Sequence, residues 1–154
     1  MIYTLALTIG VIAGLRAMMA PAAVSWATHL GSGLDLSGSW LAFLAFRWTP
    51  LIISVAALAE LVTDQLPTTP SRKVPPQFGA RLVMGAVSGA AIGTPSGAWI
   101  AGLVLGVVGA VIGTLAGAWG RGRLAAAFGR DRPAALIEDV VAIAASVFVI
   151  CQLR

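Results

Sequence analysis

The segment spanning residues 98–119 carries no charged side chain. As an α-helix it is long enough to cross the ~30 Å hydrocarbon core of a bilayer. The rest of the chain has a similar character, since 58% of its 154 residues are hydrophobic and 10% are charged. Soluble domains contain about 25% charged residues, and a chain of this length forms too small a core to bury so much apolar surface. The sequence therefore predicts an all-α integral membrane protein with a single domain, residues 1–154.

Apolar stretches recur along the chain between polar connections and predict about five transmembrane helices. A turn at residues 94–97 makes the third and fourth spans an antiparallel hairpin. We expect a basic connector at residues 120–133, with a short interfacial helix around residues 124–128. A proline-rich connection, residues 67–76, cannot be helical through its length. The expected spans cover residues 1–28, 48–66, 78–93, 98–119 and 135–153.

The first of these segments is too long for one straight span. Residues 1–28 would extend about 40 Å as a helix, which exceeds the hydrocarbon core. Pro21 lacks a backbone donor and crowds the preceding turn. We therefore expect the first span to be broken near residues 14–21.

Basic residues in the connections indicate an orientation. Arg72 and Lys73 lie between the second and third spans, and four arginines lie between the fourth and fifth. Connections rich in Lys and Arg stay on the cytoplasmic side. With five spans, this alternation predicts an N-terminus inside and a C-terminus outside.

Glycines recur at intervals of four in the third and fourth spans, which places them along one face of each helix. We expect the two faces to meet within the hairpin, while a homodimer seam and a groove for a flat substrate remain alternatives. A homodimer is expected because a five-helix bundle is a narrow scaffold on which to enclose a pathway. The glycines of these faces are Gly85, Gly89, Gly93, Gly102, Gly106, Gly109, Gly113 and Gly117.

Ionisable residues inside apolar segments are costly and are functional candidates by default. Glu60 and Asp64 share one helix face, since they are four residues apart. We expect the carboxylates of Glu60, Asp64, Glu138 and Asp139 to converge with Arg81 at one site. Arg16 or Arg72 would offset the excess negative charge. The candidate site residues are Arg16, Glu60, Asp64, Arg81, Glu138 and Asp139.

Three interpretations of this cluster stay open. The charges could be buried ion pairs that fix helix register. They could line a pathway for an ion or a small charged solute. They could hold a divalent metal for chemistry on a lipid phosphate, although the chain lacks the closely repeated aspartates that such a site uses.

Other motifs are weaker. Ser25, His29 and Asp35 could be drawn as a hydrolase triad, but no nucleophile elbow accompanies them. Cys151 is expected to be a small packing residue. The Gly-Arg-Gly-Arg run at residues 120–123 lacks the Lys and Ser/Thr of a phosphate-binding loop. The net charge of +4 is spread over several connections, which argues against nucleic-acid binding. We expect no cofactor.

A short pattern occurs twice in the chain. Gly14-Leu-Arg16-Ala-Met-Met19 and Gly79-Ala-Arg81-Leu-Val-Met84 share the form Gly-x-Arg-x-x-Met. Each is followed by an acidic residue in a later span, Glu60 or Glu138. Duplicated halves are common in transporters, so the pattern suggests an internal duplication.

The segments that carry these residues also resemble a known family. GLRAMMAPAAVSWA, ELVTDQLPTTPSRKVPPQFGARLVMGAVSGAAIG and GRDRPAALIEDVVAI are similar to small bacterial membrane proteins catalogued as domain of unknown function 4126. The resemblance covers under half of the chain. It implies an integral protein of the bacterial cytoplasmic membrane, with polar positions that include Arg72, and it implies no activity.

The function expected from the sequence is a small transporter or channel-like protein for an ion or small charged solute. A non-catalytic membrane scaffold is the alternative, and a metal-dependent lipid-modifying enzyme is a remote one. The expected partners are the lipid bilayer, a second copy of the chain and the solute. The balance favours a role other than catalysis.

Overall fold

The structure is a computed structural model that describes residues 1–65 and 74–153. Every regular element in these residues is helical, which confirms the all-α prediction. The elements are α1 (Ile2–Leu15), α2 (Met19–His29), the 3-10 helix η1 (Ala42–Ala45), α3 (Thr49–Thr63), α4 (Pro75–Gly93), the 3-10 helix η2 (Thr94–Ser96), α5 (Trp99–Phe128) and α6 (Asp131–Gln152).

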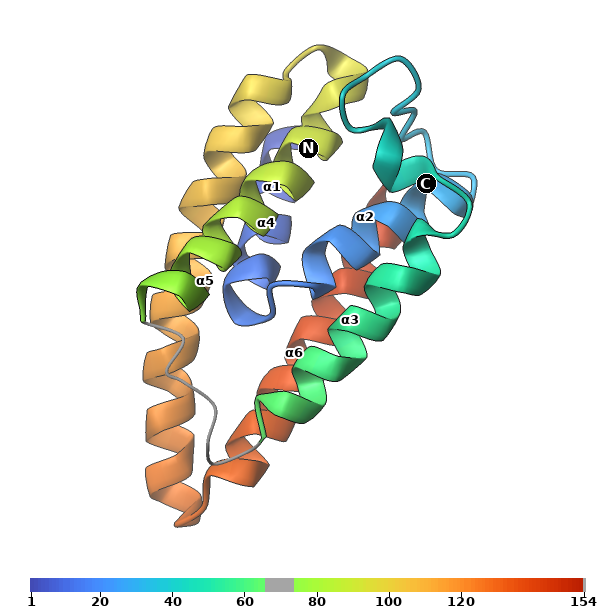
Figure 1. Cartoon of the computed structure of the whole chain (residues 1–154). Coiled ribbons are helices and arrows are strands. Elements are labelled where there is room, and N and C mark those ends of the chain that lie inside the picture. The colour runs from blue at the N-terminus through green and yellow to red at the C-terminus, as the bar shows by residue number, and fades with distance from the viewer. Residues whose placement is uncertain (66–73, 154) are drawn as a thin grey trace.

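The helices form two layers (Figure 1). Helices α1, α4 and α5 pack tightly on one another and are called the glycine layer here. Helices α2, α3 and α6 make up the other layer, which is called the carboxylate layer. The chain passes from the first layer to the second within its first 30 residues, at the junction of α1 and α2.

Two helices, α5 and α6, are long and apolar enough to cross a membrane. Their most apolar stretches are only 33% and 39% buried within the chain, so much of their apolar surface faces outward. Large apolar side chains are exposed on α3 as well, including Ile52, Val55 and Val62. Such a surface is stable against lipid and not against water. The structure thus fits a membrane protein, while α1 and α3 are shorter than a full span.

The first apolar segment is broken, as predicted. Helix α1 ends at Leu15, Arg16 has an extended backbone (φ −141°, ψ 111°), and α2 begins at Met19. Pro21 lies in the first turn of α2, where a missing N–H costs no helical hydrogen bond. The proline therefore follows the break and is compatible with the new helix.

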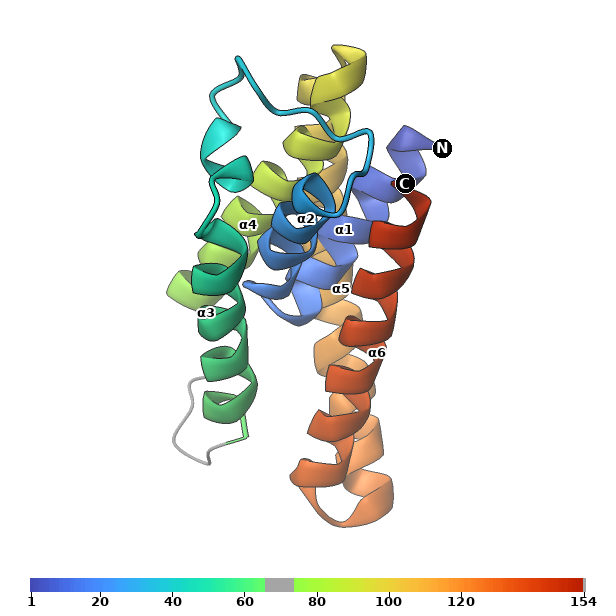
Figure 2. The same ribbon diagram turned by 90° about the vertical axis from the view of Figure 1, so that its right-hand side faces the viewer.

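The two termini lie at the same end of the molecule (Figure 1), which does not support the predicted placement on opposite sides of a membrane. Gly10 meets Gly106, and Gly14 meets Ala110, so α1 runs parallel to α5. Helix α6 returns beside α5, and the carbonyl of Leu153 accepts a hydrogen bond from the amide of Gly33. Both termini therefore lie at the same end of the molecule (Figures 1 and 2). The reason is that α1 and α2 do not continue in one direction, because the chain reverses at the break.

The glycine faces meet as expected. A side chain at Gly106 would overlap the backbone of Gly85, and one at Gly102 would overlap Gly89. The remaining face of α5 packs on α1, where Gly109 and Gly113 lie against the backbone of Leu7 and Val11. These faces are filled within the chain, so they supply no homodimer seam and no substrate groove. Gly93 meets the turn residue Ala98, and Gly117 is half-buried on α5.

The predicted connector at residues 120–133 is much shorter in the structure. Residues 124–128 are helical as expected, but they form the end of α5 and not a separate interfacial helix. Helix α5 continues without interruption to Phe128, and α6 begins at Asp131. Gly129 ends α5 with a left-handed backbone (φ 64°), which glycine adopts without strain. Alanine and leucine in residues 124–127 favour helix strongly enough to outweigh the two glycines before them. Pro75 and Pro76 of the predicted proline-rich connection occupy the first turn of α4, where proline needs no helical hydrogen bond.

Residues 67–73 of that connection, with Arg72, lie outside the described residues.

Candidate functional site

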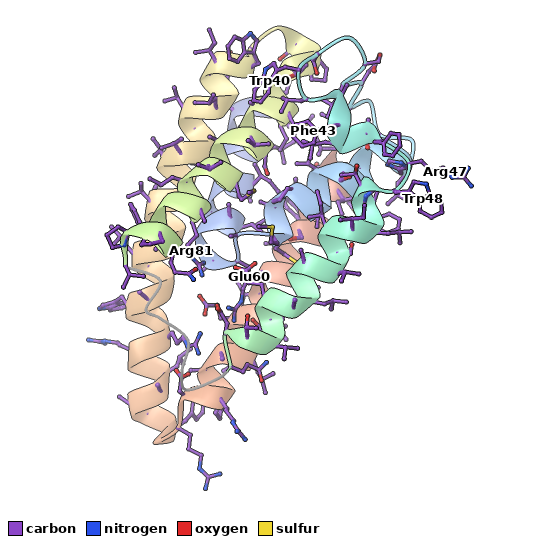
Figure 3. All side chains as sticks on the ribbon, viewed as in Figure 1. Trp40, Phe43, Arg47, Trp48, Glu60 and Arg81 are labelled. Carbon is purple, nitrogen blue, oxygen red and sulfur yellow. The ribbon has the colours of Figure 1, made fainter. Side chains whose placement is uncertain are left out.

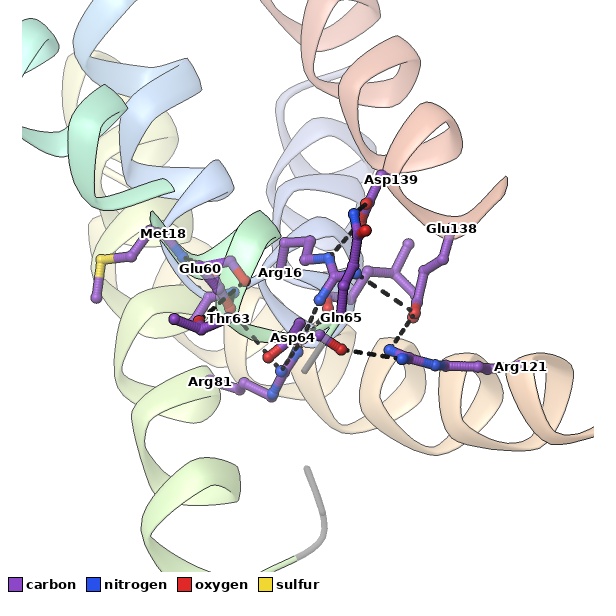
Figure 4. A network of polar contacts seen from close by, with 12 residues as sticks. Arg16, Met18, Glu60, Thr63, Asp64, Gln65, Arg81, Arg121, Glu138 and Asp139 are labelled. Atoms are coloured by element: carbon purple, nitrogen blue, oxygen red, sulfur yellow. Dashed lines mark hydrogen bonds and ion pairs between the residues drawn. The ribbon is translucent and has the colours of Figure 1, made fainter. Parts of the chain in front are cut away.

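Arginines from the glycine layer face carboxylates from the carboxylate layer (Figures 3 and 4). Arg16 follows α1, Arg81 belongs to α4 and Arg121 to α5. The acids are at the end of α3 and in the first half of α6. The structure brings together all six residues that the sequence singled out, namely Arg16, Glu60, Asp64, Arg81, Glu138 and Asp139.

Arg16 is the centre of this cluster and is 1% exposed. Its Nε donates a hydrogen bond to Asp139 Oδ1 at 2.8 Å, and its Nη1 donates to Asp64 Oδ2. Its Nη2 lies 4.0 Å from Glu138 Oε2. The extended backbone at Arg16 points this side chain between α3 and α6, so one guanidinium joins both acidic helices.

Arg81 stabilises the end of α1. Its Nη1 donates hydrogen bonds to the carbonyl oxygens of Gly14 (2.8 Å) and Leu15 (2.6 Å). The hydroxyl of Thr114 also donates to the Gly14 carbonyl, at 3.2 Å. The last carbonyls of a helix have no partner within it and carry partial negative charge, which a guanidinium offsets.

Glu60 stabilises the start of α2 by accepting hydrogen bonds from backbone amides. Its Oε1 accepts a hydrogen bond from the amide of Ala17 (2.7 Å), and its Oε2 accepts one from the amide of Met18 (2.8 Å). Arg81 Nη2 lies 3.8 Å from Glu60 Oε1 and 3.7 Å from Asp64 Oδ2. The two helix ends created by the break therefore each face a side chain of the sign that their dipoles favour.

Arg121 is a further member of the cluster, which was not predicted from the sequence. Its Nε and Nη2 donate to the two oxygens of Asp131 (2.9 and 2.6 Å), and its Nη1 lies 3.7 Å from Glu138 Oε2. Nη2 also donates to the backbone carbonyl of Asp64 at 3.0 Å. A signal was present, because Arg121 continues the four-residue spacing of Gly113 and Gly117. It was overlooked because the helix was expected to end at Trp119.

Two exposed tryptophans on α5 mark the depth of the cluster. Trp99 and Trp119 are 20 residues apart (119 − 99), a rise of about 30 Å along a helix, which equals the hydrocarbon thickness. Tryptophan prefers the interfaces of a bilayer. Gly14 packs beside Thr114, about one turn inside Trp119, and Arg121 lies just beyond it. The cluster thus lies toward the end of the molecule where α5 joins α6.

The other motifs do not form a site. Ser25 donates its hydroxyl proton to the Leu44 carbonyl, and His29 Nδ1 faces the Ser25 carbonyl and the Thr28 hydroxyl. Asp35 accepts hydrogen bonds from the hydroxyl and the amide of Ser37 instead, which lowers the pKa of its carboxyl below its ordinary value. The triad is therefore not assembled. Cys151 is exposed, which corrects the expectation that it packs inside.

No cation site is built from the residues that the structure describes. Among them, no group of three His, Cys, Asp or Glu side chains has the geometry to hold a metal ion. The carboxylates face arginines, whose positive charge opposes cation binding.

The repeated Gly-x-Arg-x-x-Met pattern has two different local structures. Arg16 lies in the break between helices, whereas Arg81 lies inside the continuous helix α4. The two arginines nevertheless reach the same cluster from separate helices. The structure of these segments gives no support for a duplication.

Comparisons of the chain with protein-family models, curated proteins and solved structures found no match. The resemblance to domain of unknown function 4126 therefore stays a prediction. The functional argument depends on the geometry of the cluster.

Proposed function

We propose that the protein is a small transporter or channel-like protein for an ion or small charged solute. The observation that carries the proposal is the helix break at Arg16, whose two ends meet charged side chains inside an apolar bundle. Discontinuous helices are tolerated at membrane depth where their free ends meet protein or a polar cavity. Transporters use such ends to bind charged groups of their substrates.

Burial indicates the direction from which a solute would approach. The side chains of Arg16 and Arg81 are 1% and 2% exposed, whereas those of Glu60 and Asp64 are 15% and 14% exposed. A solute would reach the carboxylates of α3 first. It would exchange with a carboxylate or an arginine as the partner of the opposite charge, and the ion-paired cluster would be the closed state.

We propose a topology that follows from the same geometry. Helices α4, α5 and α6 cross a bacterial cytoplasmic membrane, as does the segment formed by η1 and α3, since α3 alone is shorter than a full span. Helix α1 with α2 forms a re-entrant pair. The end where α5 joins α6 carries Arg123, Arg130 and Arg132, so it faces the cytoplasm. Both termini then lie outside. A homodimer is still proposed, through apolar surfaces other than the glycine faces.

Reconstituted protein on a solid-supported membrane tests the function. Concentration jumps of NaCl, KCl, sodium phosphate and HCl should give a current for at least one of these solutes. Glu60→Gln should reduce that current severalfold, because it removes a cluster charge while keeping the side-chain size. Asp35→Asn removes an acid outside the cluster and should leave the current unchanged. Folded protein that gives no current with any of these solutes, or a Glu60→Gln current equal to wild type, contradicts the proposal.

A scaffold role is the second candidate, and one observation favours it. Each of the four clustered carboxylates faces an arginine, and Glu60 also accepts two backbone amides. A cluster that only fixes the fold would tolerate exchange of an ion pair for apolar side chains of similar volume. The double variant Arg16→Met/Asp139→Leu should then keep its biological role, whereas a transporter should lose its current.

A further inference from the structure

A groove separates two helices of the carboxylate layer. It has a volume of about 300 Å³ and runs along α2, between α3 and α6. Both α3 and α6 pack on α2 (Figure 2), and little direct packing between α3 and α6 closes the groove among the described residues. Its walls include Ala22 and Trp26 of α2, Ala57 and Leu58 of α3, and Val147 of α6.

The groove has few polar groups that could form hydrogen bonds with water. Its polar atoms are few and are satisfied within the protein. Trp26 Nε1 donates to Ser54 Oγ at 2.9 Å, and Ser146 Oγ donates to the Ala142 carbonyl at 2.8 Å. Apolar cavities of about half this volume stay dry and bind small hydrocarbons. The groove therefore selects an apolar occupant.

The position of the groove indicates which apolar molecule would enter it. The rims are continuous with the outward-facing apolar surface, since Leu58 and Val147 are exposed by 62% and 53%. In a bilayer this surface faces acyl chains at very high local concentration. The inner end of the groove is at Met19 and Leu61, which adjoin the residues of the charged cluster in sequence.

We propose that the groove is a binding site for one acyl chain of a bilayer phospholipid, held between α3 and α6 on the floor formed by α2. The proposal does not rest on transport, because it uses only the shape, chemistry and depth of the groove. A bound chain would fill the space that protein packing leaves open and would support α3, which has only Pro50 and Ala57 buried.

Trp26 is a built-in reporter of this site. Bromine atoms on an acyl chain quench tryptophan fluorescence on contact, and the hydrogen bond to Ser54 fixes the indole at the groove wall. The variant that carries Trp40→Phe, Trp48→Phe, Trp99→Phe and Trp119→Phe leaves Trp26 as the only tryptophan. In vesicles of mid-chain-brominated phosphatidylcholine mixed with ordinary phosphatidylcholine, quenching should saturate at a low fraction of brominated lipid.

A matched pair of substitutions separates the groove from the general lipid surface. Ala57→Leu places a larger side chain on the groove wall, whereas Ala59→Leu adds the same atoms on the exposed side of α3. The added atoms of Ala57→Leu take up part of the space that the acyl chain would fill, so this substitution should weaken the saturable quenching about tenfold, a change of ~1.4 kcal/mol. Ala59→Leu should behave as the parent.

Native mass spectrometry of the otherwise unmodified chain gives an independent measurement if the multiple variant does not fold. One phospholipid per chain should be retained by wild type and by Ala59→Leu, and it should be lost in Ala57→Leu. Quenching that rises only in proportion to the brominated fraction, or equal retention in both variants, would overturn the proposal. Quenching that falls as the protein-to-lipid ratio rises would assign the groove to a second copy of the chain.

Discussion

The helices of the two layers pack in different ways. In the glycine layer, α1, α4 and α5 approach so closely that backbone meets backbone at Gly85, Gly106 and Gly113. In the carboxylate layer, α2, α3 and α6 are spaced by side chains, and a groove of about 300 Å³ remains between them. The first layer carries the arginines of the cluster and the second carries its acids.

This difference in packing indicates which parts of the molecule are rigid and which can move. Water exclusion does not drive helices together in lipid, so close packing of small residues supplies the attraction. The glycine layer has that packing and the carboxylate layer does not. Between the layers, an apolar core that includes Ile9, Val24 and Val149 lies in addition to the ion pairs, and we expect any opening to begin at the charged end of this boundary.

The largest effect is expected in the glycine layer. A methyl group at Gly106 would overlap the carbonyl of Gly85, so Gly106→Ala should lower the free energy of unfolding by about 3 kcal/mol or more. Nothing lies within 4 Å of the corresponding position at Gly122 on the same helix. There alanine should raise stability by ~0.5–1 kcal/mol, because it favours helix. Unfolding in mixed micelles measures both, and equal effects would show that close approach is unimportant.

The next effect concerns the boundary between the layers. Arg81→Ala removes the guanidinium beside Glu60 and leaves Asp64 with Arg16 alone. It also removes the side-chain donor of the Leu15 carbonyl and leaves the Gly14 carbonyl with the Thr114 hydroxyl. Loss of one partner of a fully buried ion pair costs ~3–5 kcal/mol, and the contacts that Arg16 and Thr114 keep should hold the loss here below that of Gly106→Ala. We expect a larger loss than in Glu60→Gln, whose amide can still accept a backbone hydrogen bond. The exposed Arg123→Ala is the control, and a variant at Arg81 as stable as this control contradicts the role of the boundary.

Much of this comparison follows from sequence, and the exceptions have physical causes. The turn at residues 94–97 predicts the hairpin. The spacing of Gly85, Gly89 and Gly102 predicts that its two helices meet along these faces, because a missing Cβ allows close approach. The convergence of Arg81 with the acids follows from the cost of isolated charge in lipid. Gly10 and Gly14, which complete the glycine layer, were not recognised as packing residues, because two glycines in one helix make only a weak pattern.

The direction of the chain could not be read from local sequence. The break at Arg16 is predicted by length and composition, but a kinked span and a reversal contain the same residues. What decides is tertiary contact, since Arg81 and Glu60 bind the two helix ends from α4 and α3. Arg121 was missed for a related reason, because a Gly-Arg-Gly run resembles a loop until the helix around it is known.

A smaller effect on stability is expected when the buried Asp139 of α6 is compared with its exposed Asp131. Asp139 is 8% exposed and accepts a hydrogen bond from Arg16, whereas Asp131 is 58% exposed and pairs with Arg121. Asp139→Asn should cost about 1–3 kcal/mol, because it leaves a buried guanidinium short of charge. Asp131→Asn should cost ~0–1 kcal/mol, as for other exposed pairs. The same unfolding measurement ranks them, and the reverse order would place the boundary nearer to the α5–α6 turn.

The smallest effect provides a reference for a carboxylate that has no arginine. Asp35 lies in the loop between α2 and η1, outside both layers, and the hydroxyl and amide of Ser37 hold its pKa below its ordinary value. A lowered pKa means that the ionised form stabilises the folded loop above the pKa of the unfolded chain, and this contribution is lost as the pH falls through the folded value.

Ser37→Ala removes the hydroxyl, which is the larger cause of the lowered pKa, so the midpoint of the Asp35 titration should move up toward the ordinary value. The amide chemical shift of residue 37, followed by NMR between about pH 2 and 6 around the ordinary Asp value, measures the midpoint in both proteins. An unchanged midpoint in Ser37→Ala would show that the amide alone holds the carboxylate, and a midpoint above the ordinary value in wild type would contradict the loop geometry itself.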